Sequence, residues 1–173
     1  MYYYTTYMSP LGEITLACDT EGKNIVGAWL KGQEYFLGTL GTEQGRAKRL
    51  PVLLQACAWL DRYFAGEKPV PQELPLAPAG NKFRQTVWSR LKQIPYGQVL
   101  TYGELAGQVA QDLGRDKMSA RAVGGAVGHN PISIIIPCHR VIGANGKLTG
   151  YAGGLEKKVQ LLRLEGIPVP AAK

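Results

Sequence analysis

Cys138 and His139 are neighbours in the sequence, and together they could form an activated nucleophile. The apolar run Ile134–Ile136 precedes them and predicts a short buried strand. Pro137 would end that strand, because proline has no N–H to donate to a ladder. A thiolate is a strong nucleophile, and an imidazole beside it can take the thiol proton. The alternative is a buried cysteine that packs as a small hydrophobe, and these residues alone favour neither interpretation.

Several short motifs surround Cys138 at fixed spacing. They are Thr101-Tyr102-Gly103, Ala120-Arg121-Ala122-Val123-Gly124, Asn130-Pro131, Pro137-Cys138-His139-Arg140-Val141, Gly150-Tyr151-Ala152-Gly153-Gly154 and Leu161-Leu162-Arg163-Leu164-Glu165-Gly166. This ordered set resembles the active-site signature of the O6-alkylguanine-DNA alkyltransferases, also called methylated-DNA–protein-cysteine methyltransferases. The resemblance is dense from residue 81 to residue 166. Over the first half it is weaker and rests on the general arrangement of the chain and not on matching motifs.

The resemblance implies a DNA repair reaction at Cys138. The protein would flip O6-alkylguanine, chiefly O6-methylguanine, out of double-stranded DNA and transfer the alkyl group irreversibly to the sulfur; O4-alkylthymine is a second candidate lesion. His139 would accept the thiol proton while Glu165 orients the imidazole. Tyr102 would donate a hydrogen bond to the leaving guanine. Because a thioether does not hydrolyse under mild conditions, we expect one turnover per molecule and no cofactor.

The resemblance also implies a set of DNA- and base-binding residues, namely Ala120, Arg121, Asn130, Val141, Tyr151 and Gly153. Arg121 would fill the gap that the flipped nucleotide leaves. The Val141 carbonyl would read the guanine amino group, and Asn130 would tie the recognition helix to the active-site strand. Ala144 departs from the pattern, because some members have a serine there that bonds the base.

The basic residues are concentrated in the second half of the chain. The net charge is +7. Residues 1–79 hold seven basic and eight acidic side chains, whereas residues 80–173 hold thirteen and five. Binding of a polyanion by the half that holds Cys138 is therefore the natural inference. The alternative is a charge that serves solubility, since the basic residues form no dense run.

The first half predicts a small α/β unit. Residues 2–8 are rich in β-prone Tyr and Thr, and the segments 13–17 and 25–30 predict two strands joined by a turn as a hairpin. Pro51 to Gly66 predicts a helix with Leu53, Cys57, Leu60 and Phe64 on its apolar face. Cys57 is thus expected in the core.

A proline-rich segment, residues 68–80, separates the two halves and predicts a semi-rigid linker. We therefore expect domains at 1–79 and 80–173. The fold class is α+β, and the resemblance implies a ribonuclease-H-like α/β domain followed by a mainly helical, winged helix-turn-helix-like DNA-binding domain. Some relatives bind zinc in the first domain through Cys and His. No histidine precedes His129 in this chain, so no metal site is expected.

The second half predicts three helices with recognisable N-terminal caps. Asn81 and Ser119 can cap the first and third, and Thr101 with Glu104 can form a capping box on the second. This order of helix, turn and helix is typical of a DNA-binding module. The third helix contains three glycines at 124, 125 and 128, each costing about 1 kcal/mol relative to Ala. Small residues allow close approach, either of a DNA groove or of another helix.

A last helix is predicted from Leu155 to Glu165, with an apolar stripe of Leu155, Val159 and Leu162, and Gly166 ends it. Glu165 lies at the C-terminal end, where the helix dipole disfavours an anion. A specific partner is one explanation, and His139 is the candidate. A solvated surface carboxylate is the other.

Composition excludes several classes of protein. The N-terminus has no charged segment followed by a long apolar run, so no signal peptide is expected. No stretch approaches the ~18 apolar residues of a membrane span. Three cysteines at scattered positions argue against a disulfide framework. We expect a cytoplasmic protein that acts as a monomer on DNA without a membrane.

Two other functions fit some of these residues. A thiol hydrolase with a Cys/His/Glu triad would use Cys138, His139 and Glu165, although no oxyanion-hole motif is evident. A non-enzymatic helix-turn-helix protein that binds alkylated DNA is the second alternative. Relatives of that kind lack the reactive cysteine, whereas Cys138 is present here.

Overall fold

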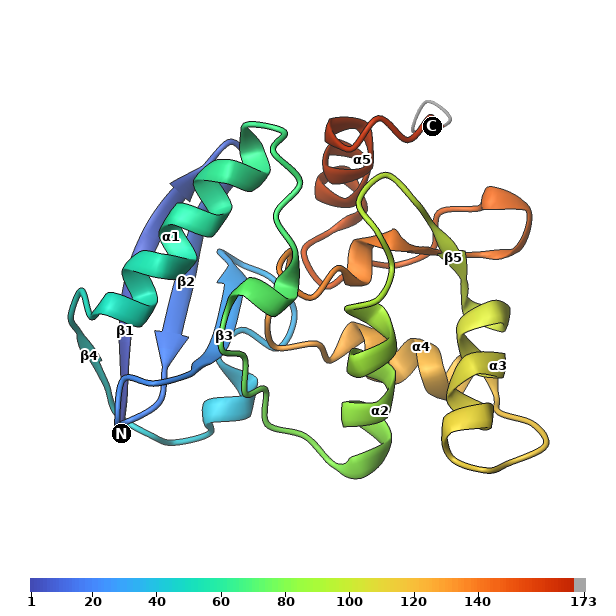
Figure 1. The fold of residues 1–173 in the computed structure, drawn as a ribbon, viewed down its shortest axis with the longest axis horizontal. Coiled ribbons are helices and arrows are strands. Elements are labelled where there is room, and N and C mark those ends of the chain that lie inside the picture. Colours follow the sequence, from blue (N-terminus) through green and yellow to red (C-terminus); the bar gives the residue numbers. More distant parts are fainter. Residues whose placement is uncertain (170–173) are drawn as a thin grey trace. The chain divides into compact units, whose positions relative to one another are not determined.

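A computed structural model describes residues 1–169 as a mixed α+β protein of two compact units (Figure 1). The first unit comprises Met1–Ala79 together with Pro131–Ile135, and the second comprises Gly80–Asn130 and the chain from Ile136 onward. The predicted α+β class is confirmed. In the described part of the chain, no helix has the length and apolar character that a membrane span requires.

The first unit is built on a four-stranded sheet with the order β3-β2-β1-β4. Its strands are β1 (Tyr2–Ser9), β2 (Gly12–Cys18), β3 (Ile25–Leu30) and β4 (Gly45–Ala47). The predicted hairpin is confirmed, because β2 and β3 pair antiparallel; β1 and β2 also pair antiparallel, and β4 runs parallel to β1.

Helix α1 (Pro51–Phe64) contacts β1, β2 and β3 and confirms the predicted helix. Its buried residues are Val52, Leu53, Ala56, Trp59, Leu60 and Tyr63. The buried face of α1 is therefore rotated slightly to one side of the predicted apolar stripe. Cys57 and Phe64 are only half-buried, which corrects the expectation that Cys57 is a core residue.

The proline-rich segment is held against the sheet of the first unit and is not an isolated linker. A 3-10 helix covers Pro71–Glu73. Ile25 N–H donates to the Pro75 carbonyl at 2.8 Å, and Ala77 N–H donates to the Ile25 carbonyl at 2.8 Å. These bonds extend the edge of β3, because a proline carbonyl can still accept where its nitrogen cannot donate.

The predicted strand at Ile134–Ile136 is absent, although all three isoleucines are buried. Ile134 has a φ of 70°, in the left-handed region that a strand does not use. Ala28 N–H donates to the Pro131 carbonyl, and Ser133 N–H donates to the Ala28 carbonyl. Residues 131–135 therefore belong to the first unit although they lie within the range 80–173. The prediction was wrong because burial of a short apolar run does not distinguish a strand from a packed turn.

The described part of the second unit contains four α-helices and a two-stranded parallel sheet. Its elements are α2 (Lys82–Leu91), β5 (Leu100–Thr101), α3 (Tyr102–Asp112), α4 (Ala120–Gly128), β6 (Val141–Ile142) and α5 (Leu155–Leu164). Helices α2, α3 and α4 pack against one another, and Trp88 Nε1 donates to the Ala126 carbonyl at 2.9 Å to join α2 to α4.

The predicted helix caps of the second unit are confirmed. Asn81 accepts from Arg84 N–H, Ser119 accepts from Ala122 N–H, and Thr101 forms the capping box with Glu104. These bonds satisfy amide donors that the first helical turn leaves open. The caps fix where α3 and α4 begin, and both helices begin beside the pocket described below.

Candidate active site

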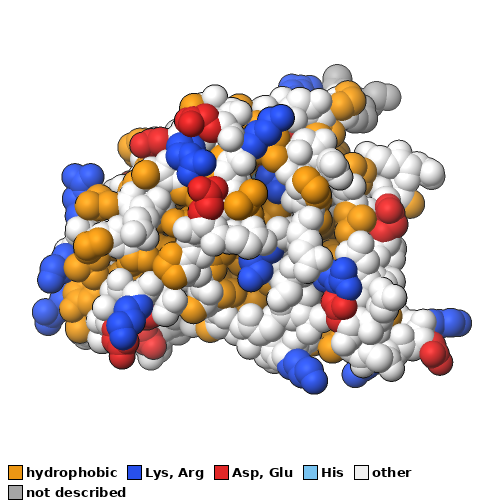
Figure 2. Space-filling view, viewed as in Figure 1, with side chains coloured by type: hydrophobic (Ala, Val, Ile, Leu, Met, Phe, Trp, Pro, Cys, Tyr) orange, Lys and Arg blue, Asp and Glu red, His pale blue; other side chains and the backbone are white. Residues whose placement is uncertain are grey.

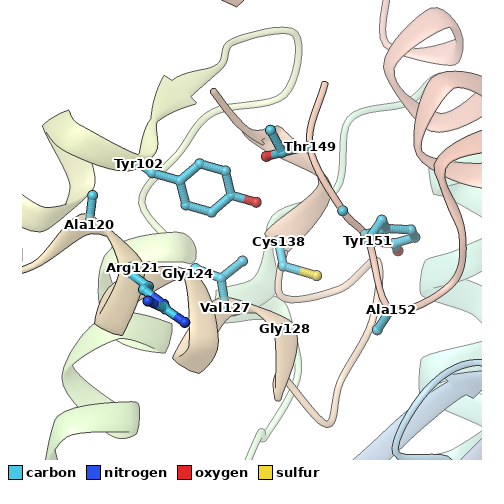
Figure 3. Close-up of a pocket in the computed structure, with 11 residues that line it drawn as sticks. Tyr102, Ala120, Arg121, Gly124, Val127, Gly128, Cys138, Thr149, Tyr151 and Ala152 are labelled. Carbon is cyan, nitrogen blue, oxygen red and sulfur yellow. The ribbon is translucent and has the colours of Figure 1, made fainter. Parts of the chain in front are cut away.

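Cys138 lies at the start of a 3-10 helix, Cys138–Arg140, and is 5% exposed. It faces a hollow of about 460 Å³ that lies within the second unit (Figure 3). The hollow is lined by Tyr102, Ala120, Arg121, Gly124, Val127, Gly128, Cys138, Thr149, Gly150, Tyr151 and Ala152. In Figure 3 the sulfur of Cys138 points into this space, with Tyr102 on one side and Tyr151 on the other.

His139 and Arg140, which follow the cysteine, both bind Glu165 at the end of α5. His139 Nε2 lies 2.6 Å from Glu165 Oε2, and Arg140 Nε donates to Oε1 at 2.8 Å. Gly97 N–H donates to Oε1 at 3.0 Å. Burial opposes ionisation of Glu165, but its bonds to His139 and Arg140 outweigh that effect and lower its pKa to about 2. The partner predicted for Glu165 is therefore present.

His139 is fully buried, and burial lowers its pKa. The nearby Glu165 carboxylate raises this pKa, and the positive charge of Arg140 lowers it. The imidazole is therefore neutral, and the Arg140 guanidinium balances the carboxylate charge. A neutral imidazole that donates Nε2–H to Glu165 keeps its lone pair on Nδ1, which gives the ring a basic nitrogen.

The Cys138 thiol is protonated at rest. Burial raises its pKa, whereas a hydrogen bond from Asn130 and the charge of Lys158 act in the opposite direction. The Asn130 amide also donates to the Ile136 carbonyl at 2.9 Å, so one side chain joins the end of α4 to the segment that carries the cysteine. Formation of a thiolate thus requires a base, and His139 follows directly in the chain.

Lys158 of α5 is a fully buried lysine beneath the hollow. Its ammonium donates to the carbonyls of Val141 at 2.6 Å, Thr149 at 3.1 Å and Gly150 at 3.3 Å. Burial lowers its pKa to about 8, so it is mostly charged at neutral pH. Its three protons therefore hold the backbone of β6 and of the loop at Thr149 and Gly150 that forms one wall of the hollow.

Tyr102, at the first position of α3, presents its hydroxyl next to Cys138 (Figure 3). Burial raises its pKa, and a hydrogen bond with Thr149 opposes this rise. The phenol therefore stays protonated and can donate. A Cβ built on Gly143 would lie 3.3 Å from the Thr149 methyl group, so that methyl lies toward Gly143 while the hydroxyl meets Tyr102.

Comparison with known proteins identifies this arrangement. Residues 2–78 match the family model of the 6-O-methylguanine DNA methyltransferase ribonuclease-like domain, and residues 82–167 match that of the DNA binding domain. The chain belongs to the 6-O-methylguanine DNA methyltransferase family. The resemblance inferred from the motifs is thus confirmed.

Relatives of the family match nearly the whole chain. The methylated-DNA–protein-cysteine methyltransferase of Methanosarcina acetivorans is 46% identical over 95% of this chain and 98% of its own length. That of Haemophilus influenzae is 43% identical, with coverages of 96% and 87%. The crystal structure of Mycobacterium tuberculosis OGT in complex with DNA has a TM-score of 0.77 and 41% identity, covering 94% of this chain and 92% of that one.

The structure places most of the predicted family residues together. Tyr102, Ala120, Arg121, Cys138 and Tyr151 line the hollow, while His139 and Glu165 lie buried behind Cys138. Asn130 is buried beneath the site and bonds the segment that carries the cysteine. Gly153 is not among the lining residues, and the Val141 carbonyl already accepts from Lys158.

Two of the three predicted glycines of α4 face open space. A Cβ on Gly125 or Gly128 would meet no atom within 4 Å among the described residues, whereas one on Gly124 would contact the Tyr102 ring at 3.7 Å. Close helix–helix packing therefore does not explain Gly125 and Gly128. They leave an open helix face beside the hollow.

Sequence reasoning missed Arg140, Lys158 and Thr149. Arg140 was visible only as part of a motif. Lys158 carried a usable signal, because it stands four residues before Leu162 and seven before Glu165, on the buried face of the helix. Thr149 carried none, since its role depends on the fold bringing it to Tyr102. Among residues 1–169, no group of three or more His, Cys, Asp or Glu side chains could hold a metal ion.

Proposed function

We propose that this chain repairs O6-alkylguanine in double-stranded DNA by transferring the alkyl group to Sγ of Cys138. The observation that carries the proposal is a buried thiol facing an open hollow, followed directly by a neutral His139 that Glu165 holds at 2.6 Å. Family relatives named methylated-DNA–protein-cysteine methyltransferases support the same reaction. The three free cysteines suit a reducing compartment, so the proposed location is the cytoplasm. The proposal also takes the protein to act as a monomer.

The reaction is an in-line displacement at the alkyl carbon. His139 takes the thiol proton at Nδ1, directly or through a water, and Glu165 stabilises the imidazolium that forms. The sulfur then bonds to the alkyl carbon as the carbon–O6 bond breaks, and the electron pair leaves with the guanine. Tyr102, which is protonated, donates a hydrogen bond to the guanine as its negative charge develops.

The target base reaches the sulfur only after it leaves the stack, at a cost of a few kcal/mol. The hollow beside α4 would receive the base, with Tyr151 on the far wall. Arg121 is exposed on α4 and would fill the gap left in the duplex. The Val141 carbonyl has a second lone pair besides the one that Lys158 uses, so it can still accept from the guanine amino group. Ala120 and Gly153 would contact the DNA and the base.

The intact mass of the protein after incubation with an O6-methylguanine duplex tests the proposal. We expect a gain of one methyl group that maps to Cys138, saturates at one per protein and is absent in Cys138→Ser. Cys18 and Cys57 serve as internal controls, because they should remain unmodified. Retention of the duplex with no change in mass would instead indicate a lesion-binding protein, and turnover of a thioester with Cys138 regenerated would indicate a hydrolase.

A further inference from the structure

A second hollow, of about 570 Å³, lies on the other flank of α4 and is called here the α2–α4 groove. It is lined by Asn81, Lys82, Phe83, Leu113, Arg115, Met118 and Ala122. These residues come from the start of α2, the turn after α3 and the first turn of α4. The proposed reaction gives no role to the turn from residue 113 to residue 118.

The groove is positively charged and its cations are available. Its lining includes Lys82 and Arg115 but no carboxylate. Both side chains are exposed, and neither forms an ion pair with another residue in the range 1–169. By contrast, the Arg90 guanidinium of α2 is already paired with Asp112 at the end of α3. Figure 2 shows basic side chains projecting beside the start of α2 and beside the turn that follows α3.

The walls between the cations are apolar. Phe83, Leu113 and Met118 are half-buried and line the same hollow. A free anion would gain nothing from these side chains, and an apolar peptide would gain nothing from Lys82 and Arg115. A sugar–phosphate backbone has both properties, because charged phosphates alternate with deoxyribose rings that have apolar faces.

The position of the groove also favours DNA. Ala122 borders the groove, whereas Arg121, its neighbour, and Gly124 border the hollow of Cys138. Successive helical residues point about 100° apart, so the two hollows flank the same exposed face of α4. In addition, the first turn of α2 contains no acidic residue, and a helix N-terminus favours a phosphate.

We propose that the α2–α4 groove holds the sugar–phosphate backbone of the duplex that carries the lesion, with phosphates bound by Lys82 and Arg115. This contact rests on the proposed function, since it requires that the chain acts on duplex DNA. It adds to the face of α4 an anchor that keeps the duplex in place while the target nucleotide leaves the stack.

The test is the salt dependence of binding to an O6-methylguanine duplex, measured by fluorescence anisotropy for Lys82→Ala, Arg115→Ala and the double variant. The slope of log K against log salt should fall by ~0.9 for each lost phosphate contact, hence by about 1.8 in the double variant. Its dissociation constant at 0.1 M salt should rise about tenfold or more. Arg163→Ala is the matched control, because it removes one exposed positive charge from α5, outside the groove.

Slopes for the Lys82 and Arg115 variants that equal the slope for Arg163→Ala would overturn the groove contact. Transfer from free O6-benzylguanine to Cys138, read by intact mass, separates this failure from that of the proposed function, because the free base needs no duplex. If the wild-type protein takes the alkyl group from the free base but the variants bind the duplex with unchanged salt slopes, the proposed function stands and the groove contact is refuted. A wild-type protein that takes no alkyl group from either source loses the proposed function.

Discussion

Arg140→Met removes the positive charge that balances Glu165, and we expect it to alter both stability and the pH dependence of alkyl transfer. Arg140 is 4% exposed, and its guanidinium donates to both Glu165 oxygens and, at 2.7 Å, to the Ile94 carbonyl. Methionine has a similar length and fills the same space without the charge. The change therefore leaves a buried carboxylate without its main counter-ion.

The expected loss of stability is large for one substitution. Removing one partner of a buried ion pair costs about 3–5 kcal/mol, because the remaining charge stays buried. For a protein of this size, each kcal/mol lowers the midpoint of thermal unfolding by about 2–4 °C. The midpoint should thus fall by roughly 6–20 °C. Arg90→Met is the control: its pair with Asp112 is partly exposed, and its loss should cost less than about 1 kcal/mol.

The loss should also depend on pH, because His139 is a titratable group bound to Glu165. In the wild type, burial and the charge of Arg140 lower the His139 pKa. Without Arg140, the carboxylate should raise that pKa, so that protonated His139 becomes the counter-ion. A raised pKa contributes stability below the unfolded value of ~6.5, and this contribution disappears as pH rises through the folded pKa. The variant should therefore lose less stability at pH 6 than at pH 8.5.

The same shift should impair catalysis at neutral pH, since a protonated imidazole cannot take the thiol proton. Urea unfolding at pH 6 and pH 8.5, with single-turnover transfer from free O6-benzylguanine across this range, measures both effects. We expect the acid limb of the rate profile to move to higher pH in Arg140→Met and to stay in place in Arg90→Met. An equal loss of stability at both pH values, together with an unshifted profile, would refute the assignment of a neutral His139.

Three further variants test other parts of the site. Burial lowers the folded pKa of Lys158 to about 8, so between this value and the ordinary 10.5 the unfolded chain binds the proton more tightly. The free energy of unfolding of the wild type, measured in urea relative to Lys158→Met, should therefore rise by up to about 3 kcal/mol across this pH range. Thr149→Val keeps the shape but loses the hydroxyl that orients Tyr102, so the single-turnover rate should fall about tenfold, which is less than the ~100- to 10,000-fold that a positioned acid–base group itself supplies. Duplex affinity by anisotropy should stay constant, and an unchanged rate would count against the role of Thr149. Arg121→Ala should slow transfer from duplex DNA far more than from the free base, and equal losses in the two rate measurements would exclude a role in flipping.

Local signals predicted the elements of this fold well. The caps at Asn81, Thr101 and Ser119 depend on bonds within four residues, which the sequence states directly. The isoleucine run failed as a strand because the Ile135 N–H turns back to the Ser133 carbonyl, while the bonds to β3, about a hundred residues earlier, are made by Pro131 and Ser133. The same holds for the proline-rich segment, whose extended shape was predictable and whose pairing with Ile25 was not.

For the active site as well, features signalled by local sequence were predicted, whereas contacts that depend on tertiary structure were not. The anion at a helix C-terminus suggested a partner for Glu165, and the family resemblance favoured His139 over a solvated carboxylate. Arg140 shares that carboxylate, but a basic residue next to a catalytic motif has many alternative roles, among them binding DNA. Thr149 and Tyr102 meet only because the loop held by Lys158 returns to the start of α3. Such contacts follow from tertiary structure, and the spacing of residues along the sequence does not reveal them.

The two buried cations act differently on the two ends of the proton transfer. Lys158 favours the Cys138 thiolate, whereas Arg140 and Lys158 both disfavour the imidazolium on His139. With burial acting on both groups, the neutral thiol and neutral imidazole are the resting state, although the nucleophile and its base follow one another in the chain. A thiol that stays protonated until the target base fills the hollow is protected from oxidation and from stray electrophiles, because the thiolate is the reactive form. For a protein that uses its nucleophile once, this protection preserves the reaction for its substrate.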